Sequence, residues 1–215
     1  MDPFALDHVI VAGPSLPDLV AALEARTGVR AVAGGRHAGQ GTHNALAGLG
    51  DERYLELLVP DPDGSGGRFR DEIRHLGRPA LHGWCARAGD ADAVAERVRS
   101  LGLSARRLPM TRTRPDGVAL AWELVYVDGH PYGGLMPFFI DWRGSPHPSA
   151  SLGGPLAFGG LELAHPDAAG LAALLGAWGP LPEGVRVVEG GAPRLAAAWR
   201  GPAGEDAWSG RGGPI

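Results

Sequence analysis

Hydrophobic positions along the chain fall into strand and helix patterns that recur in the same order. Residues 4–12 form a nearly continuous apolar run, which is typical of a buried strand, and residues 16–27 show the apolar spacing of a helix that ends at Gly28. Residues 80–86, followed by residues 90–101, repeat this order. The pattern therefore predicts a strand and then a helix in two separate parts of the chain.

Three further strands are predicted after each helix, so that each part reads βαβββ. They span residues 30–33, 42–49 and 53–59 in the first part, and 105–108, 118–127 and 135–142 in the second. Overlaying the two strand–helix segments at a shift of 74 residues gives six identities in 21 positions, where chance would give roughly two. One identity pairs His8 with His82. The self-similarity indicates a duplicated unit.

A shorter third copy is predicted after a linker rich in Pro, Ser and Gly. Its elements are a strand at 158–164, a helix at 166–178 and strands at 185–189 and 195–200. The expected organisation is a first module at 1–78, a second at 79–150, a C-terminal half module at 151–200 and a Gly/Pro-rich tail at 201–215. The half module has no histidine at the matching strand position, so we interpret it as structural cover or an interface element.

Composition narrows the class of protein. The chain has 215 residues, of which 44% are hydrophobic, enough for a packed core. No apolar run reaches the roughly 18 residues that cross a bilayer, and the first residues lack the features of a signal peptide. The single cysteine, Cys85, cannot form an intrachain disulfide. We therefore expect a cytoplasmic protein without a membrane partner.

Charge excludes two further classes. A net charge of −4 and a pI near 6.0, without a basic stripe, give no attraction to phosphate backbones, so nucleic acid is not an expected partner. All 20 basic residues are arginine. Schiff-base chemistry is excluded because it requires a lysine amine.

The strongest candidate for chemistry is Glu56, which lies among leucines in Tyr54-Leu55-Glu56-Leu57-Leu58. A buried carboxylate is costly unless it is paired, hydrogen-bonded or bound to a metal. Alternatively, strand alternation turns Glu56 toward water. The corresponding strand of the second module carries Asp141 in a similar apolar run, at a shift of 85 residues.

Several motifs together resemble the glyoxalase-like branch of the vicinal oxygen chelate superfamily. They are LDHVIV (6–11), GGRHAGQGTHNALAGLG (34–50), YLELLVPDP (54–62), RTRPDGVALAW (112–122), PFFIDW (137–142) and HP (147–148). The resemblance implies an α+β fold in which paired βαβββ modules form a half-open β-cup, here with the extra C-terminal βαββ half module. It also implies a divalent metal at the floor of the cup and a substrate that binds through two neighbouring oxygens.

Carried onto this sequence, the resemblance implies His8, Glu56, His82 and Asp141 as metal ligands, with Glu56 or Asp141 as the catalytic proton carrier. Two imidazoles and two carboxylates suit Zn, Fe, Mn, Co or Ni rather than Ca or Mg. Alternation supports this geometry, because His8 shares one strand face with Leu6 and Ile10.

Other polar and aromatic residues are candidates for substrate binding. His43 and Asn44 are neighbours on one predicted strand, so only one of them can face the cup, and GTHN has an alternative interpretation as a turn cap. His37 is equally ambiguous between a substrate-binding role and a structural role. The remaining candidates are Arg112 and Arg114, which suit a carboxylate or are solvated loop residues, and Trp122, which is a core residue first and a substrate wall second.

Two functions from different classes follow. The first is a metal-dependent lyase, isomerase or dioxygenase that acts on a small molecule with vicinal oxygens. The second is a metal-free protein of the same fold that binds or sequesters a small molecule, since fold does not fix function. A third interpretation gives the C-terminal half module the role of an interface, and a homodimer is one assembly that such an interface would allow.

Overall fold

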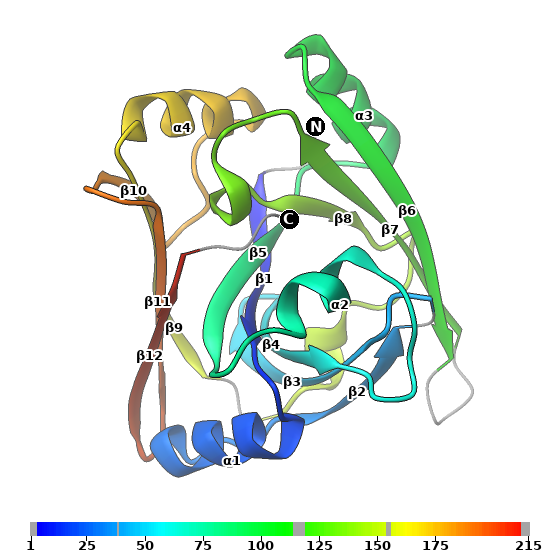
Figure 1. Cartoon of the computed structure of the whole chain (residues 1–215), viewed down its shortest axis with the longest axis vertical. Helices are drawn as coiled ribbons and strands as arrows, with labels where there is room; N and C mark the ends of the chain where they lie inside the picture. Colours follow the sequence, from blue (N-terminus) through cyan, green and yellow to red (C-terminus); the bar gives the residue numbers. More distant parts are fainter. Residues whose placement is uncertain (1–3, 38, 114–118, 154–155, 212–215) are drawn as a thin grey trace.

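The computed structural model describes residues 4–37, 39–113, 119–153 and 156–211 (Figure 1). The first module contains β1 (Ala5–Ala12), α1 (Leu16–Thr27), β2 (Val32–His37), β3 (Thr42–Gly50) and β4 (Arg53–Pro60), followed by α2 (Arg68–Ile73). The second contains β5 (Ala80–Arg87), α3 (Ala91–Ser100), β6 (Ser104–Thr113), β7 (Ala119–Asp128) and β8 (Phe138–Asp141). The C-terminal unit contains β9 (Ala157–His165), α4 (Ala168–Leu175), β10 (Val185–Glu189), β11 (Arg194–Gly201) and β12 (Gly204–Gly210).

Local signals set the bounds of α1. The side chain of Ser15 accepts a hydrogen bond from the backbone N–H of Asp18, and Pro17 occupies the first turn, where it leaves no hydrogen bond unmade. Gly28 ends the helix with φ of 73°, a left-handed conformation that glycine adopts without strain, and its N–H donates to the carbonyl of Glu24. The helix therefore begins and ends where the sequence predicts.

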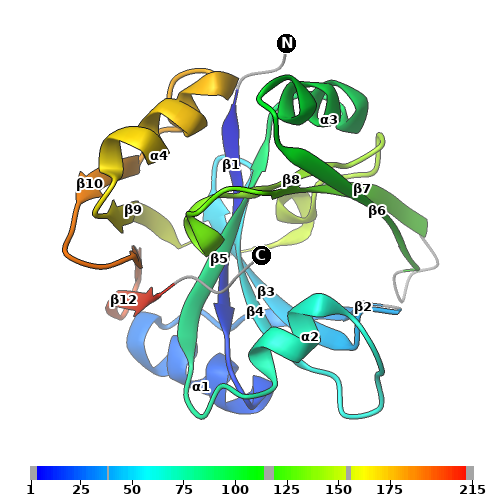
Figure 2. The same ribbon diagram turned by 45° about the horizontal axis from the view of Figure 1, so that its top comes forward.

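Eight strands of the two modules form one curved sheet in the order β2-β3-β4-β1-β5-β8-β7-β6. The modules join through the antiparallel pair β1 and β5, and in each module the first strand runs parallel to the last, β4 or β8. The edge strands β2 and β6 approach each other, so the sheet curls into a cup (Figure 2). The predicted fold class, paired βαβββ modules forming a half-open β-cup, is confirmed.

The C-terminal unit forms its own sheet, in the order β10-β9-β11-β12, against the outside of the cup. Its inner face joins the main hydrophobic core, where Leu163, Leu195 and Trp199 are buried with Trp84 of β5. Strand β12 lies so close to β5 that a side chain in place of Gly210 would collide with the carbonyl of Leu81. The unit therefore covers the convex face of the cup and leaves its interior open.

Two expectations about elements are wrong, and one helix was not expected. Residues 204–210 were expected to be part of a tail, but they form β12, which pairs with β11. The strand was not predicted because it is short and has glycine at both ends. The helix α2 was not predicted because six residues are too few to establish a helical period. Strand β8 is shorter than expected, since residues Gly133–Leu135 form a 3₁₀ turn before it.

Within the described ranges, no helix has both the length and the apolar character that a membrane span requires.

We expect Trp199→Ala to lower the free energy of unfolding by about 3–5 kcal/mol, because the side chain is fully buried between the C-terminal sheet and the cup. Urea unfolding measures this loss. Val32→Ala is the control, since Val32 is 51% exposed and its truncation should change stability by no more than about 0.5 kcal/mol. A loss for Trp199→Ala as small as that of the control would contradict the packing of the C-terminal sheet on the cup.

Candidate active site

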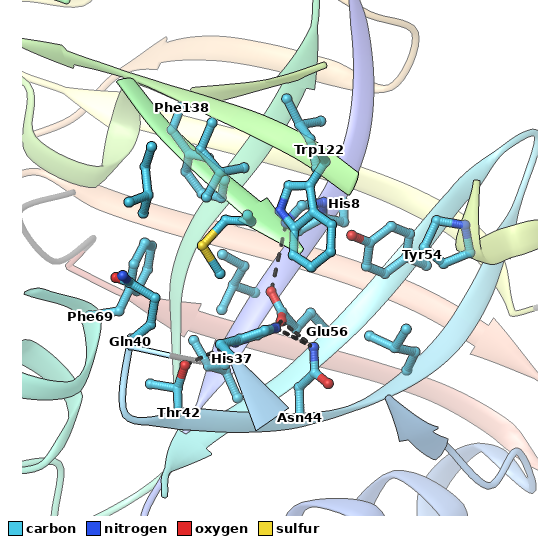
Figure 3. A pocket seen from close by; sticks show the side chains of 18 of the residues that line it. His8, His37, Gln40, Thr42, Asn44, Tyr54, Glu56, Phe69, Trp122 and Phe138 are labelled. Carbon is cyan, nitrogen blue, oxygen red and sulfur yellow. Dashed lines mark hydrogen bonds and ion pairs between the residues drawn. The ribbon is translucent and has the colours of Figure 1, made fainter. Parts of the chain in front are cut away.

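The concave face of the eight-stranded sheet surrounds a pocket of about 730 Å³, including the part that opens to solvent (Figure 3). Strands β1 to β4 and the turn before β3 supply its polar side chains: His8, His37, Gln40, Thr42, Asn44, Tyr54 and Glu56. Strands β6 to β8 supply an apolar and aromatic lining. The two modules therefore contribute unlike halves to one pocket.

Glu56 lies on β4 with its side chain in this pocket and only 7% of the residue exposed. The amide of Asn44 donates to Glu56 Oε1 at 2.5 Å, and His37 Nε2 lies 3.8 Å from the same oxygen. His8 Nε2 lies 3.6 Å from the other oxygen, Oε2. The carboxylate thus faces the pocket rather than bulk water, and it has imidazole groups near both oxygens (Figure 3).

A β-bulge at Asp7 sets the orientation of His8. Leu6 pairs with Ala86 and His8 with Cys85, so Asp7 has no partner on β5, and the strand is bent at this point. Asp7 Oδ1 lies 2.7 Å from His8 Nδ1, and the ring of Tyr54 stacks on the imidazole at 4.5 Å. These contacts hold Nδ1 on the protein side and leave Nε2 directed at Glu56.

The carboxylate of Asp7 is itself fully buried. Its second oxygen, Oδ2, accepts hydrogen bonds from Trp142 Nε1 at 3.0 Å and His147 Nε2 at 3.2 Å, and it forms an ion pair with Arg87 Nε at 3.2 Å. Burial alone would raise the pKa of Asp7, but the hydrogen bonds with His147 and His8 outweigh burial and hold its pKa well below the ordinary value of 3.8. Asp7 is therefore ionised, and His8 Nδ1 must be the donor in their hydrogen bond.

His37 is oriented in a similar way by β3. Its Nδ1 lies 2.9 Å from Thr42 Oγ1, and its Nε2 lies 3.3 Å from the amide nitrogen of Asn44. Asn44 fits beside β2 only because residue 34 is glycine, since a Cβ atom there would lie 2.1 Å from Asn44 Oδ1. His43 does not line the pocket. Of the two neighbours, Asn44 is the one that faces the cup.

The structure does not bring the four expected metal ligands together, since His82 lies behind the pocket wall. It occupies a second bulge, because Ile10 pairs with Gly83 and Val11 with Leu81. Its Nε2 lies 3.4 Å from Glu72 Oε2 on α2, and its ring packs against Phe69 at 5.6 Å. The overlay that matched His82 to His8 could not detect the two bulges.

Asp141 lies on the outer side of the sheet. It accepts hydrogen bonds from the backbone N–H groups of Ala91, at the start of α3, and of Arg143, at 3.1 and 2.8 Å. On β8 and just after it, Phe138, Ile140 and Trp142 face the pocket, so alternation turns Asp141 away. The sequence overlay of YLEL on FIDW places Asp141 at the position of Glu56, but an error of one residue in register exchanges the two faces of a strand.

The remaining candidates fall in different places. Trp122 of β7 lines the pocket and is 9% exposed. Arg112 lies on β6, where its backbone pairs with Leu120, and Arg114 lies outside the described residues.

Sequence reasoning missed Asp7 and Phe69. Asp7 directly precedes His8, and strict alternation assigns it to the opposite face, so only the bulge reveals its contact. Phe69 lines the pocket from α2, the helix that the sequence did not predict. A signal for Asp7 was nonetheless present, because an aspartate inside the apolar run FALDHVIVA needs partners.

The cup and its paired βαβββ modules define a protein of the vicinal oxygen chelate fold. The chain belongs to the glyoxalase-like domain family, whose family model matches residues 6–179. No curated protein sequence matches the chain significantly.

The chain is similar to solved structures at low sequence identity. A hypothetical protein from Staphylococcus aureus is 15% identical, with a TM-score of 0.68 over 88% of both chains. Methylmalonyl-CoA epimerase from Mycobacterium tuberculosis is 22% identical, with a TM-score of 0.45 over 63% of this chain and 85% of its own. A methylmalonyl-CoA epimerase in complex with methylmalonyl-CoA and NH4+ is 20% identical, with a TM-score of 0.48 over 68% of this chain and 100% of its own. At 15% identity, the first of these similarities shows the fold alone.

We expect Asp7→Asn to cost about 3–5 kcal/mol of stability at pH 7, because an amide cannot replace the buried charge between His8, His147 and Arg87. The pKa of Asp7 is lowered by folding, so its contribution is complete above about 3.8 and is lost as pH falls below that value. The stability difference between wild type and variant should therefore shrink below this pH. Urea unfolding at pH 7, 5 and 3 measures it, and a difference that stays constant with pH would contradict the ionised state of Asp7.

Proposed function

We propose that the protein is an enzyme that moves a proton on a small molecule bound through neighbouring oxygens, with Glu56 as the proton carrier. The observation that supports this most is the position of Glu56, a buried carboxylate in a pocket, with imidazole nitrogens 3.6 and 3.8 Å from its two oxygens. A carboxylate held in a fixed position beside hydrogen-bonding groups can act as a general acid or base.

The two oxygens of Glu56 have different tasks in this proposal. Asn44 fixes Oε1 through its hydrogen bond, whereas the nearest imidazole lies 3.6 Å from Oε2, beyond hydrogen-bond distance. Oε2 is therefore the atom that accepts a proton from a carbon next to a carbonyl group. The C–H electron pair moves to the carbonyl oxygen, and the same carboxyl group returns the proton to carbon.

A divalent metal suits three of the residues in this pocket: His8, His37 and Glu56. Each imidazole has Nδ1 held by an oxygen, from Asp7 or Thr42, which is how proteins usually orient histidine ligands. Two nitrogens and a carboxylate suit Zn, Fe, Mn, Co or Ni. When bound, such an ion supplies polarisation of the substrate oxygens.

A different cluster, Asp7, His8 and Cys85, has ligand atoms within 4.8 Å of one another, but its chemistry is less suitable. Both oxygens of Asp7 already accept hydrogen bonds. Burial, together with the charges of Asp7 and Glu56, raises the pKa of the Cys85 thiol well above its ordinary value, whereas metals bind the thiolate. We therefore assign the metal to the pocket side of His8.

A second candidate function is binding without conversion. It is favoured by the lining from β6 to β8, whose described residues include no carboxylate that could act as a second proton carrier. A binding protein would need only the shape of the pocket and the hydrogen-bonding groups at Glu56.

Metal content separates these functions. Protein purified without chelator should contain about one transition-metal ion per chain, and His8→Ala and Glu56→Gln should lose it, because each removes one of about three ligands. His82→Ala is the matched control, since it removes a buried histidine outside the pocket and should keep the metal. Elemental analysis gives the result. A metal-free wild type, or loss of metal only in His82→Ala, would contradict this ligand set.

Proton transfer is tested by hydrogen exchange. We expect the protein to accelerate exchange of the carbon-bound protons of small hydroxyketones in D₂O, measured by NMR, and Glu56→Gln to slow the reaction by about 10²–10⁴-fold, the usual contribution of a general base. The His82→Ala variant should retain the wild-type rate. Exchange that persists in Glu56→Gln would rule out Glu56 as the proton carrier.

A further inference from the structure

Tyr126 brings a polar group into the apolar half of the pocket. Among the described side chains that β6 to β8 place there, Tyr126 alone carries an oxygen atom. The residue is buried on β7, with only 3% of its surface exposed. The proton transfer proposed for Glu56 makes no use of this hydroxyl. Tyr126 is therefore a candidate for a second polar contact with the ligand.

The neighbouring strands hold the ring of Tyr126 upright on the sheet. Arg106 is its register partner on β6, and the guanidinium carbon of Arg106 lies 4.0 Å from the centre of the ring. On β8, Phe138 stacks on the same ring, with the two ring centres 5.3 Å apart. Since β6 and β8 flank β7 on opposite sides, both faces of the ring are covered. The ring therefore presents its edge, with the hydroxyl at the tip, to the pocket.

The Tyr126 hydroxyl needs a partner when a ligand fills the pocket. No hydrogen bond joins it to another residue within the part of the chain that the structure describes. Burial raises the pKa of Tyr126, so the phenol keeps its proton near neutral pH and acts as a donor. A ligand displaces water from this donor, and the hydroxyl is then left unpaired unless the ligand supplies an acceptor.

Arg106 places a positive charge behind this donor. Its charge lowers the pKa of Tyr126 more strongly than the charge of Glu56 or Glu72 raises it, although burial remains the largest influence. Arg106 Nε pairs with Asp128 Oδ2 at 3.2 Å, while its buried Nη2 has no hydrogen-bond partner among the described residues. A guanidinium on the ring face makes the phenol more acidic and therefore a stronger donor, above all to a charged acceptor.

Tyr126 lies far from the polar end of the pocket. Besides stacking on Phe138, its ring lies 6.2 Å from that of Phe69 on α2. Figure 3 shows Phe138 across the pocket from Glu56 and Asn44. A ligand that reaches both Glu56 and Tyr126 must therefore span the pocket and carry a polar group at each end.

We propose that Tyr126, backed by Arg106, binds an acceptor oxygen of a carbonyl or carboxylate group at the end of the ligand remote from Glu56. The two neighbouring oxygens at the other end rest on the proposed function. Tyr126 determines specificity, and Arg106 is a positioning residue that acts through it. A ligand with an alkyl group in place of the acceptor is disfavoured, because it leaves a buried hydroxyl unpaired.

A series of hydroxamates tests this recognition. Each compound has a hydroxamate, whose two neighbouring oxygens bind at the Glu56 end, and a carboxylate, a methyl ketone or an alkyl group at the other end. The carboxylates are the monohydroxamates of succinate, glutarate and adipate, and the other two classes match them in length. Isothermal titration calorimetry on the wild-type protein as isolated gives the affinities. At the length that fits best, we expect the carboxylate and the ketone to bind at least about tenfold more tightly than the alkyl compound.

Tyr126→Phe removes the hydroxyl and keeps the ring between Arg106 and Phe138. This variant should lose the preference by binding the carboxylate and the ketone about tenfold more weakly, with the affinity of the alkyl compound unchanged. Tyr132→Phe is the matched control, because the Tyr132 hydroxyl donates to Asp167 at 2.9 Å and lies outside the pocket. It should keep the wild-type preference.

Arg106→Met tests the positioning role, since it removes the charge and keeps an unbranched chain on the ring. We expect it to weaken the binding of the carboxylate several-fold, and to have no further effect when it is combined with Tyr126→Phe. A role of Arg106 in structure alone would instead weaken binding equally in both backgrounds, which would contradict its action through Tyr126.

Two results would overturn the inference: equal affinity of the three classes at every length, or a preference that persists in Tyr126→Phe. The absence of binding by every compound would overturn it as well. A preference that depends on Tyr126, without hydrogen exchange by the wild type, would support this inference and contradict proton transfer by Glu56. Hydrogen exchange by the wild type together with equal affinities would support proton transfer and overturn recognition by Tyr126.

Discussion

The buried carboxylate of Asp7 is the contact on which the site depends, because it joins β1 to two segments that are distant in the sequence. His8 follows Asp7 on the same strand. Arg87 comes from β5, and Trp142 and His147 come from the segment after β8. A buried charge needs all of these partners to offset its lost hydration. Once they are in place, His8 has a fixed tautomer and a fixed direction toward Glu56, so a structural ion-pair network also sets the chemistry of the pocket.

The two modules share an architecture but contribute different kinds of side chain to the interior of the cup. The first module contributes the imidazoles of His8 and His37 near Glu56. The second contributes the apolar and aromatic lining from β6 to β8, with Asp141 turned outward to the start of α3. A symmetrical set of two histidines and two acids is therefore replaced by a polar half and an apolar half. This division allows one end of a ligand to be activated while the other end is only bound. The C-terminal sheet covers the convex face, so the interior stays available to ligand.

Sequence patterns predicted most of the fold because apolar periodicity reports burial directly. The bounds of α1 and the order of both βαβββ modules follow from it, as does the position of Glu56 inside a strand. The second half of the site could not be predicted, because it depends on which face each residue takes. One bulge at Asp7 and another at His82 each shift that face by one residue, and a bulge leaves no mark in the sequence. The helix α2, which brings Phe69 to the pocket, could not be predicted either, because six residues are too few to show a helical period.

The most direct test of this account is the position of the proton on His8, because the ionised Asp7 requires Nδ1 to be the donor and Nε2 to face Glu56. Nitrogen-15 NMR of labelled protein distinguishes a protonated imidazole nitrogen from one that is bare or bound to metal, and Asp7→Asn assigns the signal. The account predicts a proton on His8 Nδ1, which donates to Asp7. A bare Nδ1 would contradict it, because His8 would then not donate to Asp7.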